Sequence, residues 1–156
     1  MFKLLSSGLV VFAGVACAPA GVAPLRLVQP PEVHRDARLE TLRGFFERTG
    51  CPARDYSQVF LDAADDYRLD WRLLPGIAVI ESTCGKAAPH NNIFGWANGK
   101  SRFSSPTAAI WGVARQFGES RLYRHRSLNR LLAIYNHNPA YAAKVKDVMQ
   151  RIASVQ

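Results

Sequence analysis

The chain has 156 residues, which is enough for one domain with a hydrophobic core. Hydrophobic residues make up 48% of it and charged residues 21%, as in ordinary globular domains, and no segment after the N-terminus is long and apolar enough to span a bilayer. The formal net charge is +8, and residues 82–156 hold eleven Lys and Arg but only two acidic residues. This distribution favours an anionic partner. If the protein is exported, that partner is the cell envelope. The alternative is nucleic acid, for which we find no recognition motif.

The N-terminus has the features of an export signal. Lys3 precedes a long uncharged apolar run, and Ala18 to Ala20 supply small residues for cleavage before Gly21. We therefore predict a signal peptide over residues 1–20, a proline-rich tether over 21–35 and one domain over 36–156, in a protein that is periplasmic or secreted. The alternative to this cleavage is a lipid anchor on Cys17.

Export makes a disulfide the natural state of the two remaining cysteines. Cys17 is either removed or lipidated, which leaves Cys51 and Cys84 as a pair in an oxidising compartment. The alternative is two buried free thiols. The four histidines are scattered and no Cys-x-x-C sequence occurs, so we predict no metal site and no cofactor.

After the tether, apolar residues recur at helical spacing and helix-start signals separate the runs. The first run contains Leu39 to Phe46 and stops at Gly50. Later helix starts are indicated by an Asp55/Gln58 capping box, Asp70, Ser105-Pro106, Ser127 and Asn138-Pro139. The pattern predicts an all-α domain of about six helices.

The segment between Gly85 and Ser104 breaks the helical pattern. Asn98-Gly99 lies between two aromatic-bearing runs, which is a strong short-range signal for a β-hairpin. We therefore expect a small β-hairpin after the third helix. Phe94 and Phe103 are expected to pack into the core beneath it.

Glu81 occupies a position where an apolar residue is expected. Leu74, Ile77, Ala78 and Glu81 follow one another at i, i+3, i+4 and i+7, so Glu81 extends the apolar stripe of its helix near the C-terminus. Burial and the negative end of the helix dipole both favour a protonated carboxyl, which is what a general acid in glycoside cleavage needs. The alternative is a Glu at the rim of the stripe that turns out to water.

A longer motif follows this carboxylate. The chain reads Glu81-Ser-Thr-Cys-Gly-Lys86, then Asn91-Asn-Ile-Phe-Gly-Trp96, then Arg102-Phe-Ser-Ser105. From about Phe45 to Ile152 the sequence resembles the glucosaminidase family of peptidoglycan hydrolases, which share the lysozyme-like fold with the lytic transglycosylases. The resemblance implies that Glu81 is the catalytic acid, that residues 92–96 line the sugar groove and that Tyr135 faces the cleft opposite the acid.

The chemistry of the side chains agrees with this implication. Asparagine amides can pair with both the donor and the acceptor of an N-acetyl group, and a glycine lets backbone approach a ligand closely. Tryptophan and tyrosine offer flat apolar faces to sugar rings and polar tips to hydroxyls. The expected substrate-binding residues are Asn91, Asn92, Gly95, Trp96, Tyr135 and Tyr141.

Together these features predict a lysozyme-like hydrolase of the endo-β-N-acetylglucosaminidase type, which cuts a β-1,4 bond of peptidoglycan next to N-acetylglucosamine. No Asp or Glu occurs between Ser82 and Gly118, so Glu81 would act as the single acid while the substrate's acetamido group assists. The alternatives are a lytic transglycosylase and a wall-binding module with weak turnover. The expected partner is a peptidoglycan strand rather than nucleic acid, and we expect a monomer.

Overall fold

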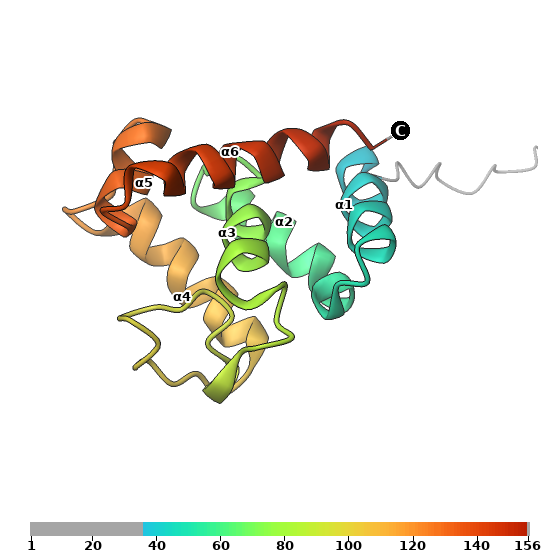
Figure 1. The fold of residues 1–156 in the computed structure, drawn as a ribbon, viewed down its shortest axis with the longest axis horizontal. Coiled ribbons are helices and arrows are strands. Elements are labelled where there is room, and N and C mark those ends of the chain that lie inside the picture. Colours follow the sequence, from blue (N-terminus) through green and yellow to red (C-terminus); the bar gives the residue numbers. More distant parts are fainter. Residues whose placement is uncertain (1–35, 156) are drawn as a thin grey trace, which may run out of the picture. The chain divides into compact units, whose positions relative to one another are not determined.

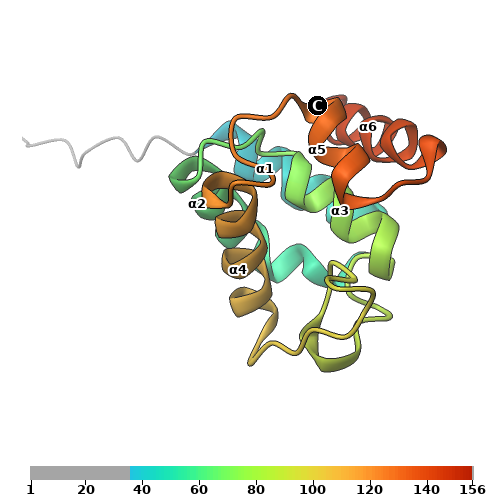
Figure 2. The same ribbon diagram turned by 90° about the vertical axis from the view of Figure 1, so that its left-hand side faces the viewer.

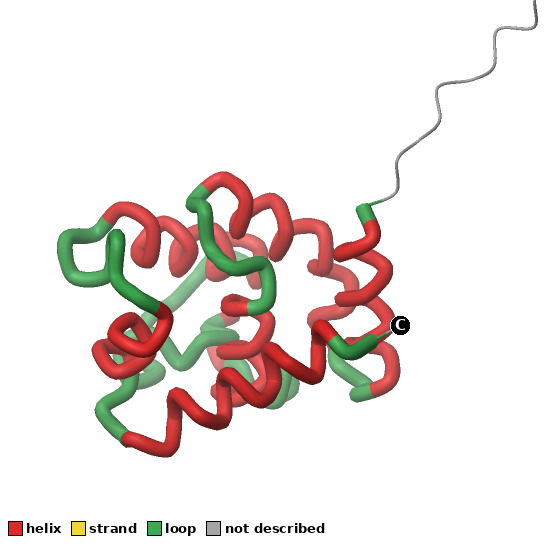
Figure 3. Tube along the Cα trace, turned by 90° about the horizontal axis from the view of Figure 1, so that it is seen from above, coloured by secondary structure: helices red, strands yellow, loops and turns green. Residues whose placement is uncertain are grey.

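The computed structural model of the chain describes residues 36–155, so the predicted signal peptide, tether and Cys17 anchor lie outside the described residues. Within this range the chain forms six α-helices and two short 3₁₀ helices and contains no strand (Figures 1 and 3). The predicted all-α class with about six helices is confirmed. The elements are α1 (Ala37–Arg48), η1 (Pro52–Tyr56), α2 (Ser57–Asp66), α3 (Leu73–Ser82), η2 (Pro89–Asn91), α4 (Pro106–Glu119), α5 (Leu128–Tyr135) and α6 (Pro139–Ala153).

Four of the six α-helices begin with a side chain that accepts a backbone N–H from the first helical turn. These caps are Asp36, Ser105, Ser127 and Asn138. The last three were predicted from sequence, and both α4 and α6 have proline in the first turn, where a missing N–H removes no helical bond. In all these cases the start signal lies directly beside the helix that it starts.

The capping box predicted at Asp55 is wrong. Asp55 lies inside η1, and α2 begins at Ser57 without a cap from any described side chain. Pro52 starts the 3₁₀ helix directly after Cys51, so helical geometry is already established when the chain reaches Asp55. The Ser57 hydroxyl instead donates to the Arg54 carbonyl at 2.6 Å.

Helix α3 is the central element of the core, and α6 packs across it (Figures 1 and 2). Its first six residues, 73 to 78, are all buried. The two helices approach closely at Gly76, where a Cβ atom would lie 3.1 Å from Met149 Cγ. Packing therefore fixes the first turns of α3, and this holds the position of Glu81 near its end.

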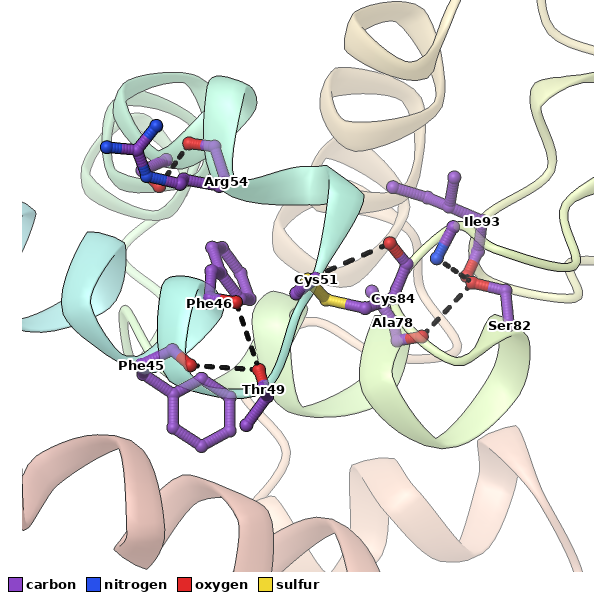
Figure 4. Close-up of a disulfide and its surroundings, with 11 residues drawn as sticks. Phe45, Phe46, Thr49, Cys51, Arg54, Ala78, Ser82, Cys84 and Ile93 are labelled. Atoms are coloured by element: carbon purple, nitrogen blue, oxygen red, sulfur yellow. Dashed lines mark hydrogen bonds between the residues drawn. A yellow bond between two sulfur atoms is a disulfide. The ribbon is translucent and has the colours of Figure 1, made fainter.

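The Cys51–Cys84 disulfide is present, as predicted (Figure 4). The two Cα atoms are 5.4 Å apart, and both residues are buried. The bond joins the turn after α1 to the chain just beyond the end of α3. It thereby ties the segment that follows Glu81 to the body of the domain.

The predicted β-hairpin is not formed: the chain between α3 and α4 consists of turns and η2. The Asn98-Gly99 turn itself exists, since both residues have positive φ and the Lys100 N–H donates to the Ala97 carbonyl at 3.1 Å. However, the Asn92 side chain bonds both the N–H and the carbonyl of Trp96. The Ser101 N–H still reaches the Trp96 carbonyl at 3.3 Å, but the Trp96 N–H is held by the Asn92 side chain, so no ladder extends from the turn and it remains part of an irregular loop.

None of the helices within residues 36–155 has the length and apolar character needed to cross a membrane.

Candidate active site

Glu81 lies one residue before the end of α3, and its side chain is half-buried. Leu74, Ile77 and Ala78 are each 0% exposed, so the stripe that Glu81 extends does face the core. The carboxyl therefore emerges at the edge of the core rather than from the outer face of the helix. A position of this kind removes part of the hydration of a carboxyl while leaving it open to a ligand.

The buried hydroxyl of Ser82 connects the end of α3 to the loop that follows (Figure 4). It donates to the Ile93 carbonyl at 2.8 Å and accepts the Gly85 N–H at 2.8 Å. Between these contacts the chain reverses direction, with Thr83 and Cys84 both at positive φ. The Ser in the Glu-Ser motif thus brings the loop back to the end of the helix that carries Glu81.

Gly95 lies directly against the Glu81 carboxyl. A Cβ atom at position 95 would lie 2.7 Å from Glu81 Oε2, well inside contact distance, and the residue has a φ of 61°. The backbone conformation therefore favours glycine here, and any larger residue would force the Glu81 carboxyl to shift. The loop backbone restricts the carboxyl on this side, so a ligand must approach it from another.

The Glu81 carboxyl opens into a cleft of about 440 Å³. The residues that line it come from α3, the loop, the chain between α4 and α5, and the end of α5. They are Glu81, Gly95, Trp96, Ala97, Asn98, Gly99, Tyr123, Tyr135 and Asn136. Among these described residues Glu81 is the only acid, so the cleft combines one carboxylate with aromatic and amide groups.

Three aromatic side chains form a wall of the cleft. The Trp96 ring centroid lies 5.7 Å from that of Tyr135 and 6.0 Å from that of Tyr123. The Tyr135 hydroxyl donates to the Phe94 carbonyl, which fixes its ring relative to the loop. Phe94 is fully buried, as predicted. The predicted partners Trp96 and Tyr135 are therefore brought together with Glu81 around one cavity.

Tyr141 lies behind this wall rather than in it. Its ring stacks on Tyr135 with centroids 5.8 Å apart, and the residue is only 5% exposed. Its buried hydroxyl makes no hydrogen bond to a described residue, although it is close enough to Glu81 for that carboxyl to influence its pKa. Burial, followed by the influence of Glu81, raises the pKa of both tyrosines, so both hydroxyls stay protonated and Tyr141 has a proton to donate toward Glu81.

Asn91 and Asn92 do not reach the cleft. The Asn91 amide donates to the Phe103 carbonyl at 3.0 Å. The amide of Asn92, which is 3% exposed, accepts the Trp96 N–H at 2.8 Å and donates to the Trp96 carbonyl at 3.0 Å. Both amides thus hold the loop in shape, and Asn92 positions the backbone of Trp96. Phe103 is half-buried against the core.

The structure adds cleft residues that the sequence did not indicate. Tyr123 lies in a segment whose visible feature is its basic charge, and Asn136 directly follows the predicted Tyr135. The sequence indicates Asn98 and Gly99 only as a turn and gives no signal for Ala97. In the part of the chain that the structure describes, no group of three His, Cys, Asp or Glu side chains is placed to bind a metal ion.

The fold and the site define a class of protein: an all-helical, disulfide-linked domain with a single carboxylate in an aromatic cleft. Comparison with known proteins gives no narrower assignment, since no family model, no curated protein and no solved structure matches the chain. Function is therefore inferred from the chemistry of the site.

Proposed function

We propose that this protein is an exported peptidoglycan hydrolase with a lysozyme-like fold, which cleaves a β-1,4 bond next to N-acetylglucosamine with Glu81 as the general acid. The observation that carries the proposal is that Glu81 is the sole acid among the described residues lining an aromatic cleft. Aromatic faces suit sugar rings, and a carboxyl that opens into the same cleft can serve as a general acid. The resemblance of the Glu81 motif to the glucosaminidases supports the same substrate.

A single acid requires help from the substrate. The two-carboxylate mechanism places the second carboxyl about 5–9.5 Å from the first. In the substrate-assisted alternative, the acetamido carbonyl oxygen of the bound sugar attacks its own C1. Glu81 meanwhile transfers its proton to the leaving glycosidic oxygen as the C1–O bond breaks. The product of this step is a cyclic oxazolinium intermediate and an ionised Glu81.

The second half of the reaction restores the enzyme. Water attacks C1 of the oxazolinium ring, and the Glu81 carboxylate takes the proton that the water loses. The ring opens to the acetamido group, and the acid is protonated again. The Tyr141 hydroxyl, whose pKa is raised chiefly by burial, stays protonated and could turn to donate to the Glu81 carboxylate between the two steps.

Product analysis on purified glycan strands tests this function. Mass spectrometry should find new reducing N-acetylglucosamine ends with the native protein and none with Glu81→Gln. Glu119→Gln is the matched control, because Glu119 is exposed on α4 and does not line the cleft. Anhydro ends would identify a lytic transglycosylase, reducing N-acetylmuramic ends would move the cut to the other bond, and tight binding without any product would leave a wall-binding module.

The aromatic wall can be tested separately. Trp96→Ala removes a ring that touches Tyr135 and Tyr123, and it should raise KM for glycan strands about tenfold or more because a sugar loses its stacking surface. Thermal unfolding is measured beside the kinetics. If the melting temperature falls while KM and kcat remain at their native values, Trp96 is a packing residue and does not bind sugar.

A further inference from the structure

A second pocket, of about 210 Å³, adjoins the cleft because Trp96 lines both. It lies between residues 101–103 of the loop and the middle of α4. The Phe103 ring packs against α4 at Gly112, where a Cβ atom would lie 3.3 Å from Phe103 Cε1. Loop and helix are therefore in direct contact at the edge of this pocket. A ligand bound in the cleft against Trp96 would therefore lie next to this pocket.

The pocket is lined by two cations and no acid. Arg102 reaches it from the loop and Arg115 from α4, and both side chains are exposed. Neither arginine forms an ion pair with any residue in the described range 36–155. Two guanidinium groups from different elements thus share a concave surface without a counter-charge from the protein.

Contacts within the loop hold Arg102 in place. Its Nη1 lies 3.0 Å from His90 Nδ1, and because arginine can only donate, the histidine nitrogen accepts. The Phe103 N–H donates to the His90 carbonyl, and the Asn91 amide donates to the Phe103 carbonyl, each at 3.0 Å. One of the five guanidinium N–H groups is therefore used to fix the side chain, and others remain for a ligand.

We propose that this pocket binds a carboxylate of the stem peptide carried by the wall strand, and that it selects strands with free peptide carboxyls over strands in which these groups are blocked. The inference rests on the proposed function. In a peptide-bearing strand the sugar rings and acetamido groups are neutral and the lactyl carboxyl of N-acetylmuramic acid is amide-linked to the peptide, so the negative charge lies in the carboxyl groups of the peptide. Paired arginines are suited to a carboxylate through charge-assisted hydrogen bonds. Trp96 places this subsite next to the sugar in the cleft.

The experiment compares kcat/KM on two substrates of equal length: native peptide-bearing strands, and the same strands with their carboxyl groups blocked as methylamides. The native protein should be about tenfold or more slower on blocked strands. Arg102→Gln/Arg115→Gln should be slower by a similar factor on native strands and within about twofold of the native protein on blocked ones. Arg121→Gln/Arg130→Gln is the control, because it removes the same charge from exposed residues outside the pocket and should behave as the native protein.

Each contrary result has a definite meaning. A native protein that cuts neither substrate would overturn the proposed function, and the subsite with it. If it cuts both substrates equally well, or if the pocket variant cuts native strands at the native rate, the subsite is refuted while the function stands. Equal losses in the pocket variant and the control variant would assign the effect to overall charge and would also refute the subsite.

Discussion

Replacing Gly95 by alanine tests whether the loop backbone holds the Glu81 carboxyl in position. An alanine at a φ of 61° costs about 1–2 kcal/mol. Its Cβ would lie 2.7 Å from Glu81 Oε2, so the carboxyl must move by several tenths of an ångström, and an off-rotamer side chain costs about 0.5–1.5 kcal/mol. We therefore expect Gly95→Ala to lower the free energy of unfolding by about 2–3 kcal/mol and to remove most activity, because the acid leaves its place.

Gly99→Ala separates the cost of the backbone conformation from the cost of displacing the Glu81 carboxyl. Gly99 has a φ of 78°, but no described atom lies within 4 Å of the Cβ that an alanine would add, so only the backbone cost of about 1–2 kcal/mol applies. In a Glu81→Ala background, Gly95→Ala should also show only this backbone cost. Urea unfolding followed by circular dichroism gives the free energies of unfolding of Gly95→Ala, Gly99→Ala, Glu81→Ala and the Gly95→Ala/Glu81→Ala double variant. If Gly95→Ala costs no more than Gly99→Ala, and Glu81→Ala does not relieve it, the loop does not restrain the acid.

Three further changes address stability. Replacing Cys51 and Cys84 by alanine opens a covalent loop of 33 residues and should lower the free energy of unfolding by about 3–4 kcal/mol, measured by urea unfolding; a loss below about 1 kcal/mol would contradict the loop-entropy reasoning. Thr83→Gly should raise it by about 0.5–1 kcal/mol, because a β-branched residue is held at a φ of 51°, and a decrease would show that Thr83 is not strained. The Arg38 guanidinium lowers the pKa of Asp65, so the small advantage over Asp65→Asn should be constant above about pH 5 and decline as the pH falls below about 4. An advantage that is undiminished at pH 2 would exclude this ion pair as its source.

The helices could be predicted because the signals that specify them are local. Ser105, Ser127 and Asn138 cap the helices that directly follow them, and the apolar periodicity of each helix lies within its own sequence. The disulfide followed from the count of cysteines and the expected compartment. Glu81 could be singled out because it takes the last position of a stripe that is otherwise apolar. The four positions of this stripe lie on one helix, so the pattern can be seen in the sequence alone.

The loop could not be predicted in the same way, because its form depends on competition between hydrogen-bond partners. Asn98-Gly99 correctly indicates a tight turn, but it does not reveal that Asn92 bonds the backbone of Trp96. Tyr123 was missed for a related reason. Its segment has no helical period, and the packing of the chain between α4 and α5 is what places its ring beside Trp96.

Asn92 shows why residue chemistry alone does not assign a role. An amide that can pair with an N-acetyl group can pair equally well with a peptide group, and in the fold its partner is the backbone of Trp96. Asn92→Ala would leave the Trp96 N–H without its partner and the Trp96 carbonyl with the Ser101 N–H alone, at 3.3 Å, beside a residue that is 3% exposed. Such a loss costs about 1–3 kcal/mol for a buried polar group.

Asn92→Asp therefore distinguishes positioning from direct binding. The carboxylate can still accept the Trp96 N–H, but its second oxygen would face the Trp96 carbonyl at a buried site, so the free energy of unfolding should fall at least as much as in Asn92→Ala. If Asn92 acts only by holding Trp96, KM should rise in proportion to the loss of stability across the two variants, and Trp96→Ala should abolish the difference between them. A rise in KM with unchanged stability would instead place the amide in contact with the sugar.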